Sequence, residues 1–167
     1  TVNPADFPYE GTLGGMKWQR EIEERAYHIS GSYRAPAQLV GDFLAGKASQ
    51  GPGKVEPTYR PGVTWCDLHE FLPGKITRAL AEALPKLDGK LKGYADPDAV
   101  LTGVETRSSS PVRLNRDRAT LMAEGLDGLF PVGEGAGYAG GIMSAAVDGI
   151  MTAEAILGVN YDRSGNQ

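Results

Sequence analysis

The sequence predicts a mixed α+β protein that is richer in helix than in strand. Three observations support this class. Apolar residues recur at helical spacing over residues 16–29, 76–84 and 142–157. Two short apolar runs, residues 99–103 and 129–132, are of the kind that a buried strand shows. Glycine- and proline-rich stretches separate these segments, as loops do.

The first helix is predicted over residues 16–29. Trp18, Ile22 and Ala26 line one face of it, and most of the charged residues between them are expected to face solvent. Gly31 follows the last periodic position and is expected to end the helix.

A second, shorter helix is expected at residues 36–44 (PAQLVGDFL), with Pro36 in its first turn, where a missing N–H costs nothing. A long loop rich in glycine, proline and lysine follows at residues 46–61. In a compact domain, a loop of this length is typical of a functional lid or of a mobile surface excursion.

The middle of the chain holds one short turn, one helix and one strand. Asp67 is expected to cap a short helical turn within residues 63–72. The helix at residues 76–84 is followed by Pro85, which is expected to end or kink it. The strand is expected at residues 99–103, immediately before a polar, hydroxyl-rich segment.

The rest of the chain is organised around Gly128 to Gly158. A short apolar run at residues 129–132 predicts a strand, five glycines follow within residues 133–141, and the last helix then runs to Leu157. A helix N-terminus presents unpaired N–H groups and a partial positive charge, and glycine lets a ligand approach the backbone closely. This order therefore favours a site for an anionic or electron-rich ligand.

Composition excludes several classes of function. The chain has 167 residues and a formal net charge of −4, and it has no run of Lys or Arg for a nucleic-acid backbone. No apolar stretch approaches the roughly 20 residues needed to span a bilayer, and no signal-peptide pattern is present. Cys66 is the single cysteine, which excludes an internal disulfide and a structural zinc site. We therefore expect a cytoplasmic protein with no metal and no nucleic-acid or membrane partner.

The glycine loop contains the spacing of a dinucleotide fingerprint. Gly135-Ala136-Gly137-Tyr138-Ala139-Gly140 matches G-x-G-x-x-G, but confirmation requires a second parallel strand that ends in an acidic residue about 20 residues later. Asp162 has the right spacing, yet residues 158–167 are too few to form that strand. The loop is therefore expected to add to a nucleotide site built elsewhere, and the start at Thr1 without a methionine suggests a piece of a longer protein.

Two segments, GVETRSSSPVR at residues 103–113 and GLFPVGEGAGYAGGIMSAAVDGIMTAEAI at residues 128–156, closely resemble the C-terminal region of a family of FAD-dependent dehydrogenases or oxidoreductases. The segments WQREIEERAY, APAQLVGDFL and ITRALAEALP resemble the central segment of that family. The resemblance implies FAD as the cofactor and hydride transfer through the flavin to a small-molecule substrate. It also implies that the Rossmann glycine motif of the FAD domain lies far earlier in a longer chain.

The resemblance also implies a domain organisation. Residues 1–98 would be a central helical segment of the substrate lobe, residues 99–158 the C-terminal part of the FAD-binding domain, and residues 159–167 a tail. The remainder of the FAD-binding domain is then the expected partner. The isolated chain is not expected to bind FAD tightly or to be active.

By analogy with such flavoproteins, Glu134 would accept a hydrogen bond from a ribityl hydroxyl, and the N–H groups around Gly141 and Ile142 would face the flavin N1 and C2 carbonyl. Reduction places negative charge near N1, which a preorganised helix N-terminus stabilises. Small residues would leave room for the ring: Ala136, Ala139, Ser144 and Ala145. The expected cofactor-binding set is Gly133, Glu134, Gly135, Gly137, Tyr138, Ala139, Gly140, Gly141 and Ile142.

Arg107 and Ser109 are the candidate catalytic residues. Arg107 is suited to hold an anionic substrate or the reduced flavin, and the serines at 108–110 are suited to donate to carbonyls or phosphates, although the sequence does not single out one serine. Asp148 is interpreted as a solvated position or as a partner of Arg113 or Arg116.

Each of these hypotheses has an alternative in which the residues have a structural role. The glycine loop also suits a tight turn that lets helix and strand pack closely, and the serine segment also suits an exposed polar turn. For the whole chain, the alternatives to an enzyme are a non-enzymatic module that binds an anion or a partner through the glycine-rich loop, and a purely structural helical domain.

Overall fold

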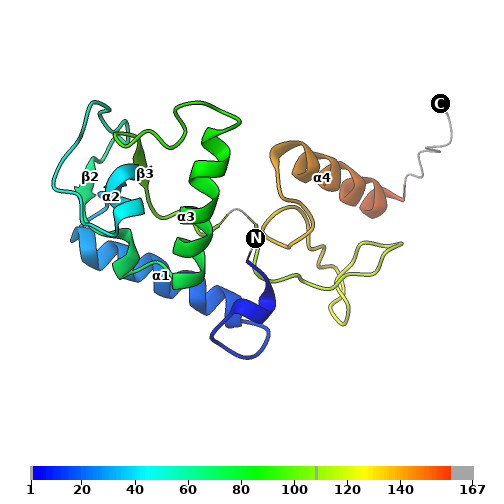
Figure 1. Ribbon diagram of the computed structural model, residues 1–167. Coiled ribbons are helices and arrows are strands. Elements are labelled where there is room, and N and C mark those ends of the chain that lie inside the picture. Colours follow the sequence, from blue (N-terminus) through cyan, green and yellow to red (C-terminus); the bar gives the residue numbers. More distant parts are fainter. Residues whose placement is uncertain (1, 108, 159–167) are drawn as a thin grey trace. The chain divides into compact units, whose positions relative to one another are not determined.

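The computed structural model describes residues 2–107 and 109–158 (Figure 1) and confirms the α+β class. The described residues form four α-helices, two short 3₁₀ helices and one small mixed sheet of three strands. The chain divides into two compact units. One unit comprises Gln19–Thr106, and the other comprises the described residues of 1–18 and 107–167. The predicted domain boundaries at residues 98 and 158 stay predictions.

The sheet lies in the unit Gln19–Thr106 and has the strand order β2-β1-β3. The central strand β1 (Ala35–Leu39) pairs in parallel with β2 (Val63–Trp65) and antiparallel with β3 (Val100–Thr102). At the middle of β1, Ala37 lies opposite Trp65 on one side and Thr102 on the other, and it is fully buried. The strand predicted at residues 99–103 is therefore confirmed.

The helix predicted at residues 36–44 is wrong over its first half. Residues 35–39 form the buried central strand, and only Val40–Ala45 form a helix, α2. Leu39, at the junction, has an extended backbone with φ −68° and ψ 143°. A short apolar run fits a buried strand and a helix equally well, and here the pairing with two neighbouring strands decides between them.

Helix α2 ends at Gly46, which lies in the left-handed region with φ 64° and whose N–H donates to the carbonyls of Asp42 and Phe43. We expect Gly46→Ala to lower the free energy of unfolding by about 1 kcal/mol, because a Cβ is disfavoured in this conformation. Gly51→Ala is the matched control, since its Cβ would meet open space and its φ is not positive. Urea unfolding of the two variants measures the difference, and equal losses would contradict the assignment of Gly46 as the cap.

Helices α1 (Gly14–Ser30) and α3 (Gly74–Asp88) agree with the sequence analysis and extend beyond the predicted ranges. Helix α1 buries Ile22 and Ala26, as expected. Helix α3 continues past Pro85, which lies inside it and does not end it.

The predicted turn after β2 is also confirmed. It is the 3₁₀ helix η2 (Leu68–Glu70), and the Asp67 carboxylate caps it by accepting the His69 N–H at 2.9 Å. The His69 ring lies stacked on Phe43 with the centroids 4.5 Å apart, and its Nδ1 is 2.7 Å from the Asp67 carboxylate. These contacts explain the position of His69 without a catalytic role.

The long loop that follows α2 is tied to the sheet at its beginning. Ser49 is 2% exposed, donates through Oγ to the Asp42 carboxylate at 2.7 Å and accepts the Leu39 N–H at 2.8 Å. Gln38 is fully buried and donates to the Lys47 carbonyl at 2.7 Å. The first residues of the loop are thus part of the packed core rather than a mobile excursion.

Cys66 lies directly after β2. It is free and half-buried, and this burial raises the pKa of its thiol. A raised pKa disfavours the reactive thiolate. This environment is that of a packed thiol rather than of a reactive one. None of the helices in the described part of the chain is both long enough and apolar enough to cross a membrane.

The second unit contains the 3₁₀ helix η1 (Pro4–Asp6) and helix α4 (Ile142–Leu157). Figure 1 draws α4 in orange to red. Helix α4 confirms the last predicted helix. The strand predicted at residues 129–132 is wrong, because this segment has no strand beside it in the described residues. The Leu129 carbonyl instead accepts the Ala123 N–H at 2.8 Å.

Candidate functional site

Helix α4 begins with backbone N–H groups for which the described residues provide no acceptor. Gly141 precedes the helix in an extended conformation, with φ −172° and ψ 167°. The first N–H of this segment to be paired is that of Ala145, which donates to the Gly141 carbonyl at 2.9 Å. Within residues 2–107 and 109–158, nothing accepts from the N–H groups of Ile142, Met143 or Ser144. Such groups carry partial positive charge and suit an electron-rich ligand.

The approach to these N–H groups is open within this unit. A Cβ added at Gly140 would meet nothing within 4 Å, and one at Gly141 would meet only the Ser144 Oγ at 3.9 Å. The side chain of Ile142 is 90% exposed. No packed side chain of the described unit therefore covers the beginning of α4.

The opposite end of the glycine loop is a closed turn. The Tyr138 N–H donates to the Gly133 carbonyl at 3.0 Å, and the Gly137 N–H donates to the Glu134 carbonyl at 2.9 Å. Gly133 and Gly137 both have positive φ, 73° and 83°, which explains the need for glycine at these two positions.

The segment around residues 112–116 packs against this turn. A Cβ at Gly137 would lie 2.7 Å from the Val112 carbonyl oxygen, so only glycine fits there. The Arg113 Nε donates to the Gly137 carbonyl at 2.8 Å, and the Leu114 N–H donates to the Ala136 carbonyl at 3.1 Å. The turn is thus held by the backbone as well as by side chains.

A buried ion pair fixes the loop to α4. Arg116 donates to the Asp148 carboxylate at 2.5 and 3.1 Å, and the two side chains are 7% and 11% exposed. Asp148 also accepts the Gly133 N–H at 2.8 Å, and Arg116 donates to the Pro131 carbonyl at 2.6 Å. The Arg116 guanidinium lies 3.6 Å from the centroid of the Tyr138 ring. Together these contacts, which we call the Arg116–Asp148 anchor, join the beginning and the end of the loop to the middle of the helix.

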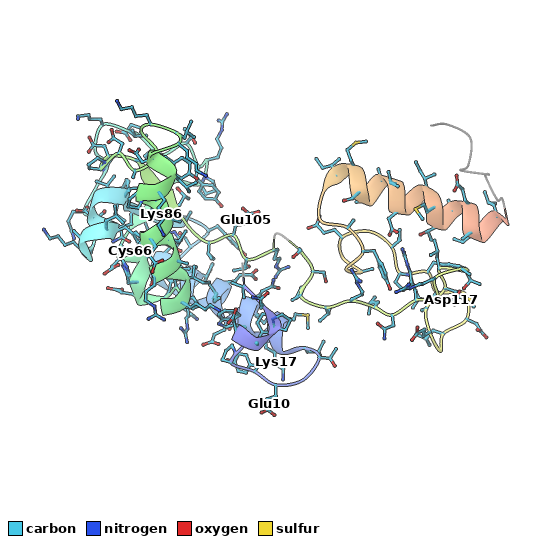
Figure 2. All side chains as sticks on the ribbon, turned by 45° about the vertical axis from the view of Figure 1, so that its right-hand side comes forward. Glu10, Lys17, Cys66, Lys86, Glu105 and Asp117 are labelled. Carbon is cyan, nitrogen blue, oxygen red and sulfur yellow. The ribbon has the colours of Figure 1, made fainter. Side chains whose placement is uncertain are left out.

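The turn before Ala123 that begins at Asp117, labelled in Figure 2, extends this support. The Asp117 carboxylate accepts the Thr120 N–H at 2.7 Å and the Ala119 N–H at 3.0 Å. The Thr120 N–H is the main cause that lowers the pKa of Asp117. Its carboxylate therefore stabilises the turn beside the anchor.

The hydrogen bonds from Arg116 lower the pKa of Asp148 below its usual range. In the unfolded chain Asp148 regains an ordinary pKa of about 3.9. The ionised pair therefore stabilises the folded protein above that pH, and this stabilisation is lost as the pH falls through the lower pKa of the folded state. We therefore expect the free energy of unfolding to decrease between about pH 5 and pH 2. Asp148→Asn should be less stable than the wild type near neutral pH, but it should lose less stability on acidification. Urea unfolding over this pH range measures both slopes, and parallel slopes would contradict the assignment.

The structure divides the nine predicted cofactor residues into two groups. Gly133, Gly137 and Tyr138 hold the closed turn, so their contacts are within the protein. The remaining residues are exposed or half-buried: Glu134, Gly135, Ala139, Gly140, Gly141 and Ile142. Of the four small residues expected to leave room for a ring, Ala136 is 6% exposed and packs inward.

The predicted catalytic residues lie in the segment that follows β3. Arg107 is exposed and has a partner within the protein. Ser109 is exposed, whereas Ser110 donates through Oγ to the Val112 carbonyl at 2.7 Å. Ser108 lies outside the described residues. The catalytic roles of Arg107 and Ser109 stay predictions.

Sequence reasoning missed the contribution of Arg116 and Tyr138 to the architecture of the loop. It did identify Arg116 as a candidate partner of Asp148, which the structure confirms. The sequence did contain a signal for the buried ion pair. Asp148 is one of two charged residues in a helix that otherwise consists mainly of apolar and small residues. A carboxylate in the middle of such a helix favours a buried pair with a cationic side chain.

Comparisons with known proteins address the identity of the chain. Residues 1–108 match the model of a family described as FAD-dependent protein, C-terminal domain-like. An uncharacterized protein of Clostridium beijerinckii (strain ATCC 51743 / NCIMB 8052) is 51% identical over 158 residues. That match covers 94% of this chain but 30% of the relative, so the chain spans less than a third of the relative's length.

Proposed function

Because the chain belongs to the family of FAD-dependent proteins that its residues 1–108 match, the C-terminal domain-like family, we propose that it forms the C-terminal part of an FAD-dependent oxidoreductase. In this proposal the open beginning of α4 faces the flavin. The observation that carries it is the set of three N–H groups, of Ile142, Met143 and Ser144, that find no acceptor among the described residues and that the glycine loop leaves uncovered.

The residues present fit the electron-rich edge of a flavin ring. Gly140 and Gly141 leave space where a side chain would stand, and the beginning of α4 carries positive partial charge. When bound, FAD supplies a hydride acceptor and donor at its N5. No described segment of this unit adds a parallel sheet for the adenosine and pyrophosphate groups, so the chain would supply one side of the site.

The role of the chain in this proposal is electrostatic. The N–H groups of Ile142 and Met143 are oriented before any electron arrives, because the Arg116–Asp148 anchor holds the loop and the helix together. A preorganised donor set of this kind is worth roughly 1–3 kcal/mol toward the more negative form of a ligand. Glu134 is exposed on the loop and is the proposed acceptor for a ribityl hydroxyl. Arg107 is the proposed contact for an anionic substrate.

The test is the visible absorbance of the full-length gene product that carries this sequence. The proposal predicts a yellow protein with a flavin spectrum that bleaches on reduction by dithionite. It also predicts that the 167-residue chain alone retains FAD much more weakly than the full-length gene product. A colourless full-length gene product that stays colourless after incubation with FAD, while its circular dichroism shows a folded protein, would contradict the proposal.

A second candidate function is a non-enzymatic module that binds an inorganic anion at the same N–H groups. One observation favours it: the family match covers residues 1–108, whereas the glycine loop lies at residues 133–141. This candidate predicts that inorganic phosphate raises the melting temperature of the full-length gene product and that FAD does not. The oxidoreductase proposal predicts instead that FAD raises the melting temperature and that inorganic phosphate does not.

A further inference from the structure

The unit Gln19–Thr106 is one continuous stretch of the chain, whereas the other unit takes its described residues from both sides of that stretch. We call the first the inserted unit and the second the host unit. A domain can be inserted into another domain when its own two ends lie close together, because the host chain then leaves and returns at one place. The inserted unit meets this condition.

The two ends of the inserted unit are joined by hydrogen bonds. The Gln19 Nε2 donates to the Thr106 carbonyl at 2.7 Å, and the Thr106 Oγ1 donates to the Glu23 carboxylate at 2.5 Å. Both bonds are partly buried, and they link residues that are 87 and 83 positions apart in the sequence. Helix α1 therefore holds the last residue of the unit beside the first.

The host unit brings the segments on either side of the insertion together. A Cβ at Gly15, in the first turn of α1, would lie 2.6 Å from the Phe7 ring and 3.1 Å from the Pro111 Cβ. The Phe7 and Trp18 rings pack with their centroids 5.7 Å apart. Phe7 precedes the inserted stretch and Pro111 follows it, so the host unit packs its own two segments against each other.

The inserted unit also has its own core. An apolar cluster joins its three strands: Ala35, Ala37, Val63, Trp65 and Val100. The largest fully buried side chains of the described residues all belong to this unit: Phe43, Phe71, Gln38, Val40 and Ser49. The host unit is held instead by the polar contacts of the Arg116–Asp148 anchor. A continuous segment with its own core and adjacent ends is typical of a cooperative folding unit.

We propose that Gln19–Thr106 is an inserted module that opens and refolds as a unit of its own, and that the host unit keeps FAD bound while this module is open. The second half of the proposal rests on the proposed function, which places the flavin at the beginning of α4, in the host unit. The first half does not involve FAD, so the two halves can be tested separately.

Hydrogen exchange of the full-length gene product in low concentrations of urea, measured by mass spectrometry, tests the proposal. Phe43→Ala removes a side chain that is 1% exposed from the core of the inserted unit, and Val40→Ala removes a smaller one from the same helix. Arg116→Ala is the matched variant in the host unit, because it breaks the Arg116–Asp148 anchor. Each variant is measured with FAD and after its removal, and the bound FAD is quantified by its absorbance.

We expect Phe43→Ala to speed exchange by about a hundredfold or more in peptides that cover β1 and α2, because loss of a buried phenylalanine shifts the opening equilibrium of the module by at least this factor. Val40→Ala should speed it by about tenfold. Peptides that cover α4 should keep their wild-type rates in both variants, and FAD should stay bound. Arg116→Ala should speed exchange in α4 and leave β1 and α2 unchanged.

Faster exchange in both units by similar factors, from either Val40→Ala or Arg116→Ala, would overturn the proposal, because the chain would then open as one domain. Release of FAD by Phe43→Ala, with unchanged exchange in α4, would overturn the second half of the proposal. A wild-type protein that binds no FAD would contradict the proposed function, and the exchange rates without FAD would still decide whether the module opens on its own.

Discussion

Arg116→Ala is expected to lower the free energy of unfolding by about 3–5 kcal/mol, because it leaves the Asp148 carboxylate charged, buried and without its partner. The pair is 7% and 11% exposed, and among the described residues Asp148 would keep the Gly133 N–H as its remaining donor. Arg116 also supports the Pro131 carbonyl and the Tyr138 ring, so several contacts would be lost at once. Urea unfolding, followed by circular dichroism, measures the change.

Arg113→Ala is the matched control for this prediction. Arg113 also donates to a loop carbonyl, that of Gly137, and lies 4.9 Å from the same Tyr138 ring, but it is exposed. Its loss is expected to cost about 1 kcal/mol or less, as for an exposed contact. If both variants lost the same small amount of stability, the Arg116–Asp148 anchor would not be the contact that holds the loop to α4.

Gly141→Val is expected to reduce the affinity of the full-length gene product for FAD by about tenfold to a hundredfold, the loss that corresponds to roughly 1–3 kcal/mol. The fold should tolerate the change. Gly141 has φ −172°, an extended conformation that any residue adopts, and its Cβ would meet only the Ser144 Oγ at 3.9 Å. The valine side chain would instead occupy the space in front of the first N–H groups of α4.

The measurement is equilibrium titration of the apoprotein with FAD, together with the melting temperature of each variant. Gly51→Val is the control, because Gly51 lies in the other unit and a Cβ there meets open space. An unchanged FAD affinity in Gly141→Val, with both variants folded, would contradict the position assigned to the flavin. A large fall in the melting temperature would show that Gly141 is packed, contrary to the structure.

The sequence predicted the elements whose pattern is local and long. The last helix, the α1 helix with buried Ile22, and the turn capped by Asp67 all follow from periodicity or from one capping residue. Helix α3 was also predicted, but its continuation past Pro85 was left open, because a proline in a sequence does not show whether the helix ends or adjusts around it.

Elements that depend on distant neighbours were predicted less well. Residues 35–39 form a strand because β2 and β3 pair with them, and such pairing cannot be inferred from a five-residue segment alone. Residues 129–132 have strand-like composition but no strand beside them in the described residues. In both cases the same apolar pattern suits two structures, and tertiary contacts select one of them.

For the candidate site, the sequence located the loop and the helix but not what holds them. Glycine spacing identified residues 133–141, and in the structure Gly133 and Gly137 have a positive φ. Glycine spacing could not show that the Arg116 guanidinium lies over the Tyr138 ring, since this contact joins residues far apart in the chain. The inward orientation of the polar side of α4 was also beyond sequence reasoning, because the apolar side of a helix normally faces the core.

The central claim is that the first N–H groups of α4 face the flavin. Hydrogen exchange measured by mass spectrometry, on the full-length gene product with and without FAD, tests it most directly. The account predicts that FAD slows exchange in peptides covering Gly140 to Ser144, whose N–H groups at 142–144 have no protein acceptor within the described residues. Saturation with FAD that leaves exchange in these peptides unchanged, while it slows exchange elsewhere in the protein, would contradict the account.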